Sequence, residues 1–192
     1  MDAMQGTLSA EQRQMLLGLA RQAVERAATG QAGPDVDLSS LPEALGAERA
    51  AFVTLTLHGD LRGCIGALQA TMPLARDVVQ HARAAAAEDF RFYPVRPDES
   101  KALEIEISVL SEPVPLAYAQ ADELLTLLRP GVDGVILVSG LHRATFLPQV
   151  WEKVQSPALF LDMLSEKAGL PRHAWRTGHP DILTYQVESF HE

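Results

Sequence analysis

The sequence is poor in cysteine and in aromatic residues, and it has no long apolar run. Its 192 residues include one Cys, and Phe, Trp and Tyr together make up 6%. A single cysteine permits neither an intrachain disulfide nor a zinc site built from several cysteines, which indicates a reducing compartment. No stretch approaches the ~20 apolar residues of a membrane span, and the N-terminus lacks the blocks of a signal peptide. We therefore expect a cytoplasmic protein that does not enter a membrane.

Clusters of basic residues are also absent. The chain has 16 Lys and Arg residues against 25 Asp and Glu residues, a formal net charge of -9, and its basic residues are scattered. Such a balance repels a phosphate backbone, so we expect no binding to nucleic acid. The six histidines lack the spacing of a metal-binding motif, and "GVDGV" lacks the Lys and the Ser or Thr of a phosphate-binding loop. We expect no metal and no cofactor.

The apolar periodicity predicts strands that arrive in hairpins rather than in alternation with helices. A capping box of Ser9 and Gln12 opens a first helix that ends at Gly30, and Pro73 lies in the first turn of a second. We expect further helices at 121–128 and 156–169, and strands within 50–68, 102–110, 133–147 and 182–190. The predicted fold class is α+β, with helices flanking one mainly antiparallel sheet. Alternation with polar neighbours predicts buried side chains at Leu55, Ile65, Leu103, Ile105, Ile107 and Val135.

The single cysteine lies in "LRGCIG", residues 61–66, within the second strand of a predicted hairpin. Side chains alternate along a strand, so Arg62 and Cys64 share one face of the sheet. We expect a turn with an odd number of residues. That register places Thr54 and Thr56 beside Arg62 and Cys64 and gathers the apolar side chains on the other face.

Two interpretations of Cys64 stay open at this point. A cation such as Arg62 favours the thiolate over the thiol, and the flanking Gly63 and Gly66 leave no side chain to shield the sulfur. Alternatively, a free cysteine commonly packs as a small apolar residue, and glycines in strands mark close packing.

"LRGCIG" resembles the signature of the AMMECR family, which is called AmmeMemoRadiSam system protein A in prokaryotes. The resemblance runs from about Leu16 to Phe190, and further matches follow in order: "DFRFYPV", "LEIEISVLSEP", "DGVILVSG", "RATFLPQVW", "LSEKAGL" and "TYQVESF". Phe90 and Tyr93 depart from the family's pattern, and both affect the backbone of a loop rather than ionisable groups.

The resemblance implies a single domain over residues 1–192, with a core of about 12–190. It implies an α+β fold of two lobes with a cleft, and the hexapeptide on or near that cleft. It also implies association with a Memo-like protein and a radical-SAM protein. It supplies no reaction.

Further polar residues fall in the matching segments. Asp89 and Arg91 could hold each other or a ligand across their loop, or could simply brace it. Thr145 and Gln149 are polar groups in an apolar stretch, and His142 is either a partner for Cys64 or a polar turn residue. The candidate substrate-binding residues are therefore Gly63, Gly66, Asp89, Arg91, His142, Thr145 and Gln149.

Two functions are compatible with these residues. In the first, the protein is an enzyme or a component of an enzyme system, with Cys64 and Arg62 as catalytic candidates that act on a small molecule or a protein. In the second, it is a non-catalytic binding or adaptor module, and "RGCIG" is a surface that a partner approaches closely. The sequence holds no second ionisable residue at a spacing that ties it to Cys64.

Overall fold

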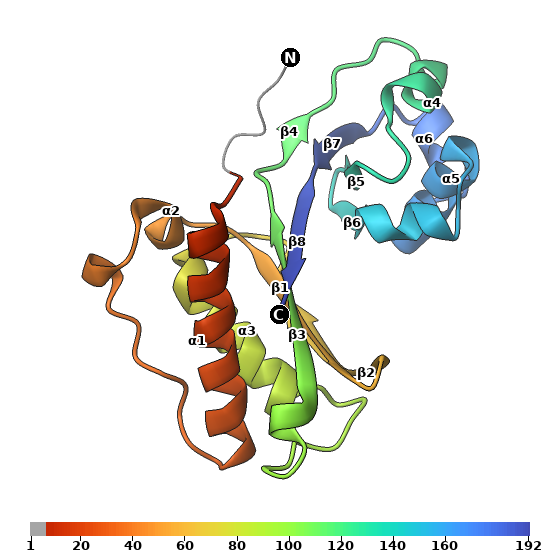
Figure 1. Cartoon of the computed structure of the whole chain (residues 1–192). Helices are drawn as coiled ribbons and strands as arrows, with labels where there is room; N and C mark the ends of the chain where they lie inside the picture. The colour runs from red at the N-terminus through yellow and green to blue at the C-terminus, as the bar shows by residue number, and fades with distance from the viewer. Residues whose placement is uncertain (1–6) are drawn as a thin grey trace. The chain divides into compact units, whose positions relative to one another are not determined.

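The computed structural model describes residues 7–192, which fold into two compact units (Figure 1). Unit 1 comprises residues 7–111 and 188–192, and unit 2 comprises residues 112–187. Each unit contains one four-stranded antiparallel sheet with helices, so the α+β class is confirmed. The expectation of one sheet is corrected to two, because the last predicted strand breaks at Gln186 and its halves join different sheets.

Unit 1 has a helical layer on one face of its sheet (Figure 1). The strands run in the order β2-β1-β3-β8, so β2 forms an edge. The capping box of Ser9 and Gln12 opens the first helix as predicted. The elements of this unit are α1 (Ala10–Ala28), α2 (Glu43–Gly46), β1 (Ala51–Leu57), β2 (Asp60–Gly66), α3 (Leu74–Ala87), β3 (Leu103–Leu110) and β8 (Val187–His191), with 3-10 turns at Leu38–Ser40 and Ser100–Ala102.

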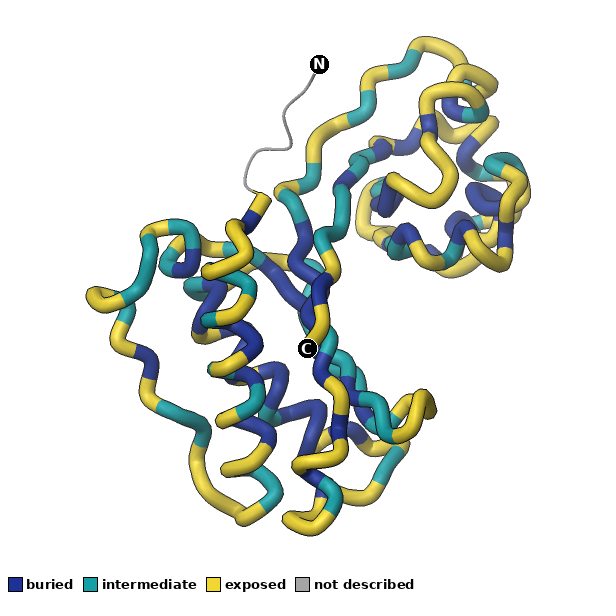
Figure 2. The backbone as a smooth tube through the Cα atoms, viewed as in Figure 1, coloured by how far each residue is buried: buried dark blue, intermediate teal, exposed yellow. Residues whose placement is uncertain are grey.

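The core of unit 1 follows the predicted alternation. Leu55, Leu103, Ile105 and Ile107 are buried against α1 and α3, and Figure 2 shows the buried inner sides of these elements. Ile65 is an exception because it lies on the edge strand and is only half-buried.

The hairpin of β1 and β2 corrects the expected turn. His58 and Gly59 both have positive φ and form a two-residue turn, so the number of turn residues is even. A register shift between Leu55 and Thr56 leaves Arg62 without a partner across the ladder, which is a β-bulge. Beyond the bulge the strands pair as an odd turn would pair them, so Cys64 lies opposite Thr54 as predicted. Before the bulge the expectation is corrected, because Thr56 lies opposite Leu61 and not opposite Arg62.

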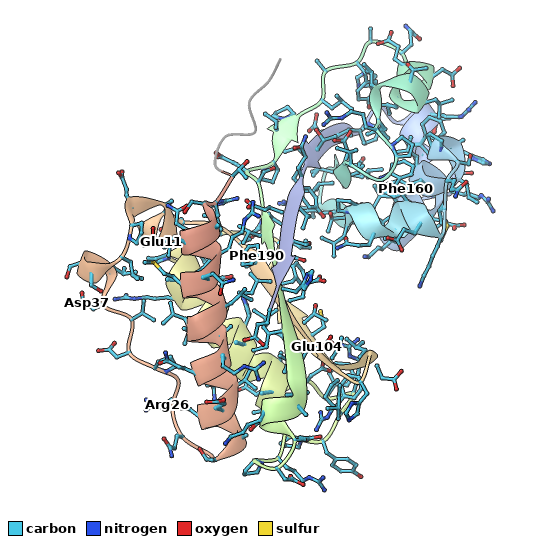
Figure 3. The ribbon with its side chains drawn as sticks, viewed as in Figure 1. Glu11, Arg26, Asp37, Glu104, Phe160 and Phe190 are labelled. Atoms are coloured by element: carbon cyan, nitrogen blue, oxygen red, sulfur yellow. The ribbon has the colours of Figure 1, made fainter. Side chains whose placement is uncertain are left out.

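Unit 2 has a core of its own, which contains stacked aromatic side chains. The rings of Trp151 and Phe160 stack with centroids 3.7 Å apart, and Trp175 is fully buried in the same core. Phe160 is labelled in Figure 3. Val135 is buried as predicted. The elements are β4 (Val114–Pro115), α4 (Leu124–Leu127), β5 (Gly134–Ser139), β6 (His142–Phe146), α5 (Pro157–Lys167), α6 (Ala174–Thr177) and β7 (Asp181–Tyr185), with 3-10 turns at Ala121–Glu123 and Pro148–Glu152.

Asp162 ties the helices of unit 2 together. Burial alone would raise the pKa of this carboxyl, but hydrogen bonds from Trp175, His173 and Arg172 together lower it.

Among residues 7–192, no helix is long and apolar enough to cross a membrane.

Close packing of α3 on β2 explains one glycine of the hexapeptide. A Cβ atom at Gly63 would lie 2.3 Å from the carbonyl oxygen of Ala85. We expect Gly63→Ala to lower the free energy of unfolding by about 1–3 kcal/mol, because either the strand or the helix must shift. Urea unfolding of the purified variant measures this loss.

Gly18→Ala is the matched control, since a Cβ atom there meets nothing within 4 Å. This change in α1 should raise the free energy of unfolding by about 0.5–1 kcal/mol, because alanine suits a helix better. Equal stability of the two variants would contradict the packing argument.

Candidate functional site

Two charged residues cover the backbone of Cys64 on the outer edge of β2. The Cys64 N–H donates to Oδ2 of Asp89 over 2.9 Å, and the Cys64 carbonyl accepts from Nη2 of Arg91 over 3.2 Å. An edge strand otherwise leaves such groups open to pairing with another chain. Asp89 and Arg91 thus take the place of a neighbouring strand at this residue.

Asp89 and Arg91 also bind each other tightly. Arg91 donates through Nη2 to Oδ2 of Asp89 over 2.6 Å and through Nε to Oδ1 over 2.9 Å. Asp89 is only 4% exposed. The hydrogen bond from Arg91 holds the pKa of this carboxyl far below its usual range, although burial opposes the shift, and the Cys64 N–H adds to the lowering. The carboxylate therefore stays charged and keeps the loop bound to the strand.

The thiol of Cys64 is half-buried and has a polar neighbour. Oγ1 of Thr54 donates to Sγ over 3.4 Å from the adjacent strand. The pKa of the Arg91 guanidinium is raised mainly by its hydrogen bond to Asp89, and the charges of Asp89 and Cys64 contribute to the same shift. The sulfur thus accepts a hydrogen bond from a hydroxyl group, and Arg91 donates to the carbonyl oxygen of the same residue.

The sequence places Arg62 beside the thiol of Cys64, but the guanidinium of Arg62 binds other groups. Its Nη2 donates to Oε1 of Glu99 over 2.7 Å, and this contact is the main cause that lowers the pKa of Glu99. Its Nη1 is buried and has no hydrogen-bond partner among the described residues. The ring of Phe92 lies 6.0 Å from the Arg62 guanidinium carbon and 5.4 Å from that of Arg91. The guanidinium that contacts Cys64 is therefore that of Arg91, and Arg62 supports the loop through Glu99.

The glycines on either side of Cys64 accommodate the protein itself. Ala85 fills the space beside Gly63, and a Cβ atom at Gly66 would lie 2.3 Å from the ring of Phe52. The missing side chains thus permit close packing of a helix and of an aromatic ring.

The remaining candidates lie in unit 2. Nδ1 of His142 lies 2.9 Å from the carbonyl oxygen of Ala168. Thr145 shares a hydrogen bond of 3.0 Å with the hydroxyl of Tyr185. Burial raises the pKa of Tyr185, and this hydrogen bond opposes the rise. Gln149 is exposed in a 3-10 turn. The site around Cys64 is therefore built from unit 1, and the predicted roles of these three residues stay predictions, as does the predicted cleft.

Glu99 and Phe92 were missed from the sequence. Glu99 follows Arg62 by 37 residues in a loop without periodicity, so no local spacing connects the two. Phe92 falls inside the matching segment "DFRFYPV", but an aromatic residue in a loop does not by itself indicate stacking on two arginines. In the described part of the chain, no three His, Cys, Asp or Glu side chains gather closely enough to hold a metal ion.

The Asp89 contacts predict a pH-dependent contribution to stability. Asp89→Asn should lower the free energy of unfolding at pH 7 by about 2–3 kcal/mol, because it breaks a buried charge pair. The folded pKa of Asp89 lies below the ~3.9 of an unfolded aspartate, so its stabilisation is complete above that value and is lost as the pH falls. Urea titrations of the wild type and the variant at pH 7 and pH 3 should therefore show a smaller difference at pH 3.

Asp98→Asn provides the control for this prediction. Asp98 pairs with Arg96 over 3.2 Å, and both side chains are largely exposed. Its loss should cost less than about 1 kcal/mol. A cost for Asp89→Asn no greater than that of Asp98→Asn would contradict the role given to Asp89.

Comparison with known proteins identifies the family and the fold of the chain. The chain matches the AMMECR1 family over residues 17–190. It is 35% identical to a protein of Methanothermobacter thermautotrophicus, over 96% of both chains, and 37% identical to one of Methanococcoides burtonii, over 89% of this chain and 84% of the relative. Its fold is similar to the crystal structure of the uncharacterized protein PH0010 from Pyrococcus horikoshii, with a TM-score of 0.81, 30% identity and coverage of 96% and 93% of the two chains. The chain therefore belongs to the AMMECR1 family.

Proposed function

We propose that this protein presents Cys64 as a reactive thiol that forms a covalent adduct with an electrophilic small molecule or protein. The observation that carries this proposal is the set of contacts around one residue. The backbone N–H, the carbonyl and Sγ of Cys64 are each hydrogen-bonded, by Asp89, Arg91 and Thr54, while the side chain stays partly exposed. A thiol held in one position loses less entropy when it reacts.

The proposed step is the attack of the Cys64 thiolate on an electrophilic carbon. The thiol proton first passes to solvent. The sulfur electron pair then forms the new C–S bond, while the bond between that carbon and the leaving group breaks and the leaving group takes the bonding pair. Thr54 stabilises negative charge on Sγ through its hydroxyl proton, and Arg91 contributes a positive charge. Arg62 acts as a positioning residue through Glu99 and Phe92.

A non-catalytic binding module is the alternative function. It is favoured by the hydrogen bond to Sγ, which among residues 7–192 comes from a hydroxyl group and not from a titratable base. In this function the surface at Cys64 would hold a partner without a covalent step. The family resemblance leads us to propose a Memo-like protein and a radical-SAM protein as the partners, and co-elution of purified components on size exclusion tests that pairing.

Thiol labelling separates the two functions. We expect iodoacetamide to label native Cys64 at pH 7, as followed by intact mass, and Thr54→Val to slow the labelling about threefold to tenfold by removing a hydrogen bond to the thiolate. Thr56→Val is the matched control, because Thr56 lies on the same strand opposite Leu61 and has no such contact with the sulfur. It should label at the wild-type rate.

Two arginine variants test the charge. Arg91→Gln should slow labelling about threefold to tenfold, whereas Arg91→Lys should keep part of the wild-type rate because it keeps the positive charge. If Cys64 is labelled in denaturant but not in the folded protein, the reactive thiol is overturned and the binding module is left. Equal rates for all variants would show that the contacts described above do not activate the sulfur.

A further inference from the structure

Unit 1 contains a shallow cavity of about 590 Å³, open to solvent, between α3 and the connector that follows α1. This connector runs back along the helical layer after Ala28 (Figure 1), and Gly33 lets it approach Val79 closely. The volume falls in the range of 300–1,000 Å³ that is typical of small-molecule sites. Ile65 lines the cavity and Cys64 does not, because neighbouring side chains of β2 point to opposite faces. The cavity is therefore separate from the thiol.

A buried histidine, backed by a buried aspartate, lines one side of the cavity. His81 lines it and is 7% exposed, and its Nδ1 lies 3.0 Å from Oδ2 of Asp77, which is 1% exposed. Oδ2 also accepts the N–H of Ala51. We assign the proton of a neutral His81 to Nδ1, which faces this carboxylate. Nε2 of His81 has no partner among the described residues and is left as a hydrogen-bond acceptor for a ligand.

Charges of both signs line the same cavity. Arg83 and Glu88 neutralise each other in an ion pair. Arg76 and Asp35 also line the cavity, and neither forms an ion pair with another described residue. One guanidinium and one carboxylate thus remain available, beside apolar surface from residues such as Val79.

We propose that this cavity binds a small zwitterion, an amino acid with an apolar side chain. Arg76 binds the carboxylate of the ligand, and Asp35 and Nε2 of His81 accept hydrogen bonds from its ammonium group. Ile65 and Val79 contact the apolar side chain. The proposal does not depend on the reactivity of Cys64, so the failure of either proposal leaves the other intact.

Titration with L-leucine tests the site in the intact protein. We expect saturable shifts of backbone amide NMR signals confined to residues 33–36 and 76–84 and to Ile65. The analogues 4-methylpentanoate and isopentylamine each keep the apolar body and one charge. Each should bind about tenfold more weakly than leucine, because one charge-assisted hydrogen-bonded group is lost. Equal binding of leucine and either analogue would overturn the zwitterion.

Charge variants locate the binding to these residues. Arg76→Gln and Asp35→Asn should each weaken leucine binding about tenfold, and both positions are exposed, so the fold should be retained. Arg96→Gln and Asp98→Asn are the matched controls, because they remove the same charges from an exposed pair outside the cavity. An equal loss in the controls, or no leucine-dependent shift in the wild type, would overturn the site.

Discussion

The buried carboxylate of Asp89 is the contact on which the arrangement around Cys64 depends. It accepts the Cys64 N–H and three hydrogen bonds from Arg91, one from the backbone N–H and two from the guanidinium. A buried charge is costly unless it is paired and hydrogen-bonded, so the loop can satisfy it only by staying against the edge of β2. The backbone of the cysteine and the course of the loop are therefore set by one interaction.

The alternation of side chains along β2 gives its two faces different chemistry. Gly63 and Ile65 point to the helices, where one permits close packing of α3 and the other lines a cavity. Cys64 points to the opposite face, where its Sγ accepts a hydrogen bond from the hydroxyl of Thr54. Three consecutive residues thus take part in core packing, in a candidate ligand site and in a candidate reactive site.

Two arginines near the ring of Phe92 differ in the carboxylate that each of them binds. Both guanidinium groups lie near this ring, but Arg62 is held by Glu99 and Arg91 by Asp89. An arginine binds a carboxylate most strongly through two parallel hydrogen bonds, so each cation goes to the acid that its backbone brings within reach.

The sequence by itself determined the local elements and the family. The capping box at Ser9, the alternation of β3 and the hexapeptide around Cys64 are each contained in a few consecutive residues, because helix capping, strand periodicity and a signature are short-range properties. The tertiary structure alone decided the partners. The bulge at Arg62, its pairing with Glu99 and the cavity at His81 join residues that are distant in the chain. Such contacts follow from how strands and loops pack, which no local pattern encodes.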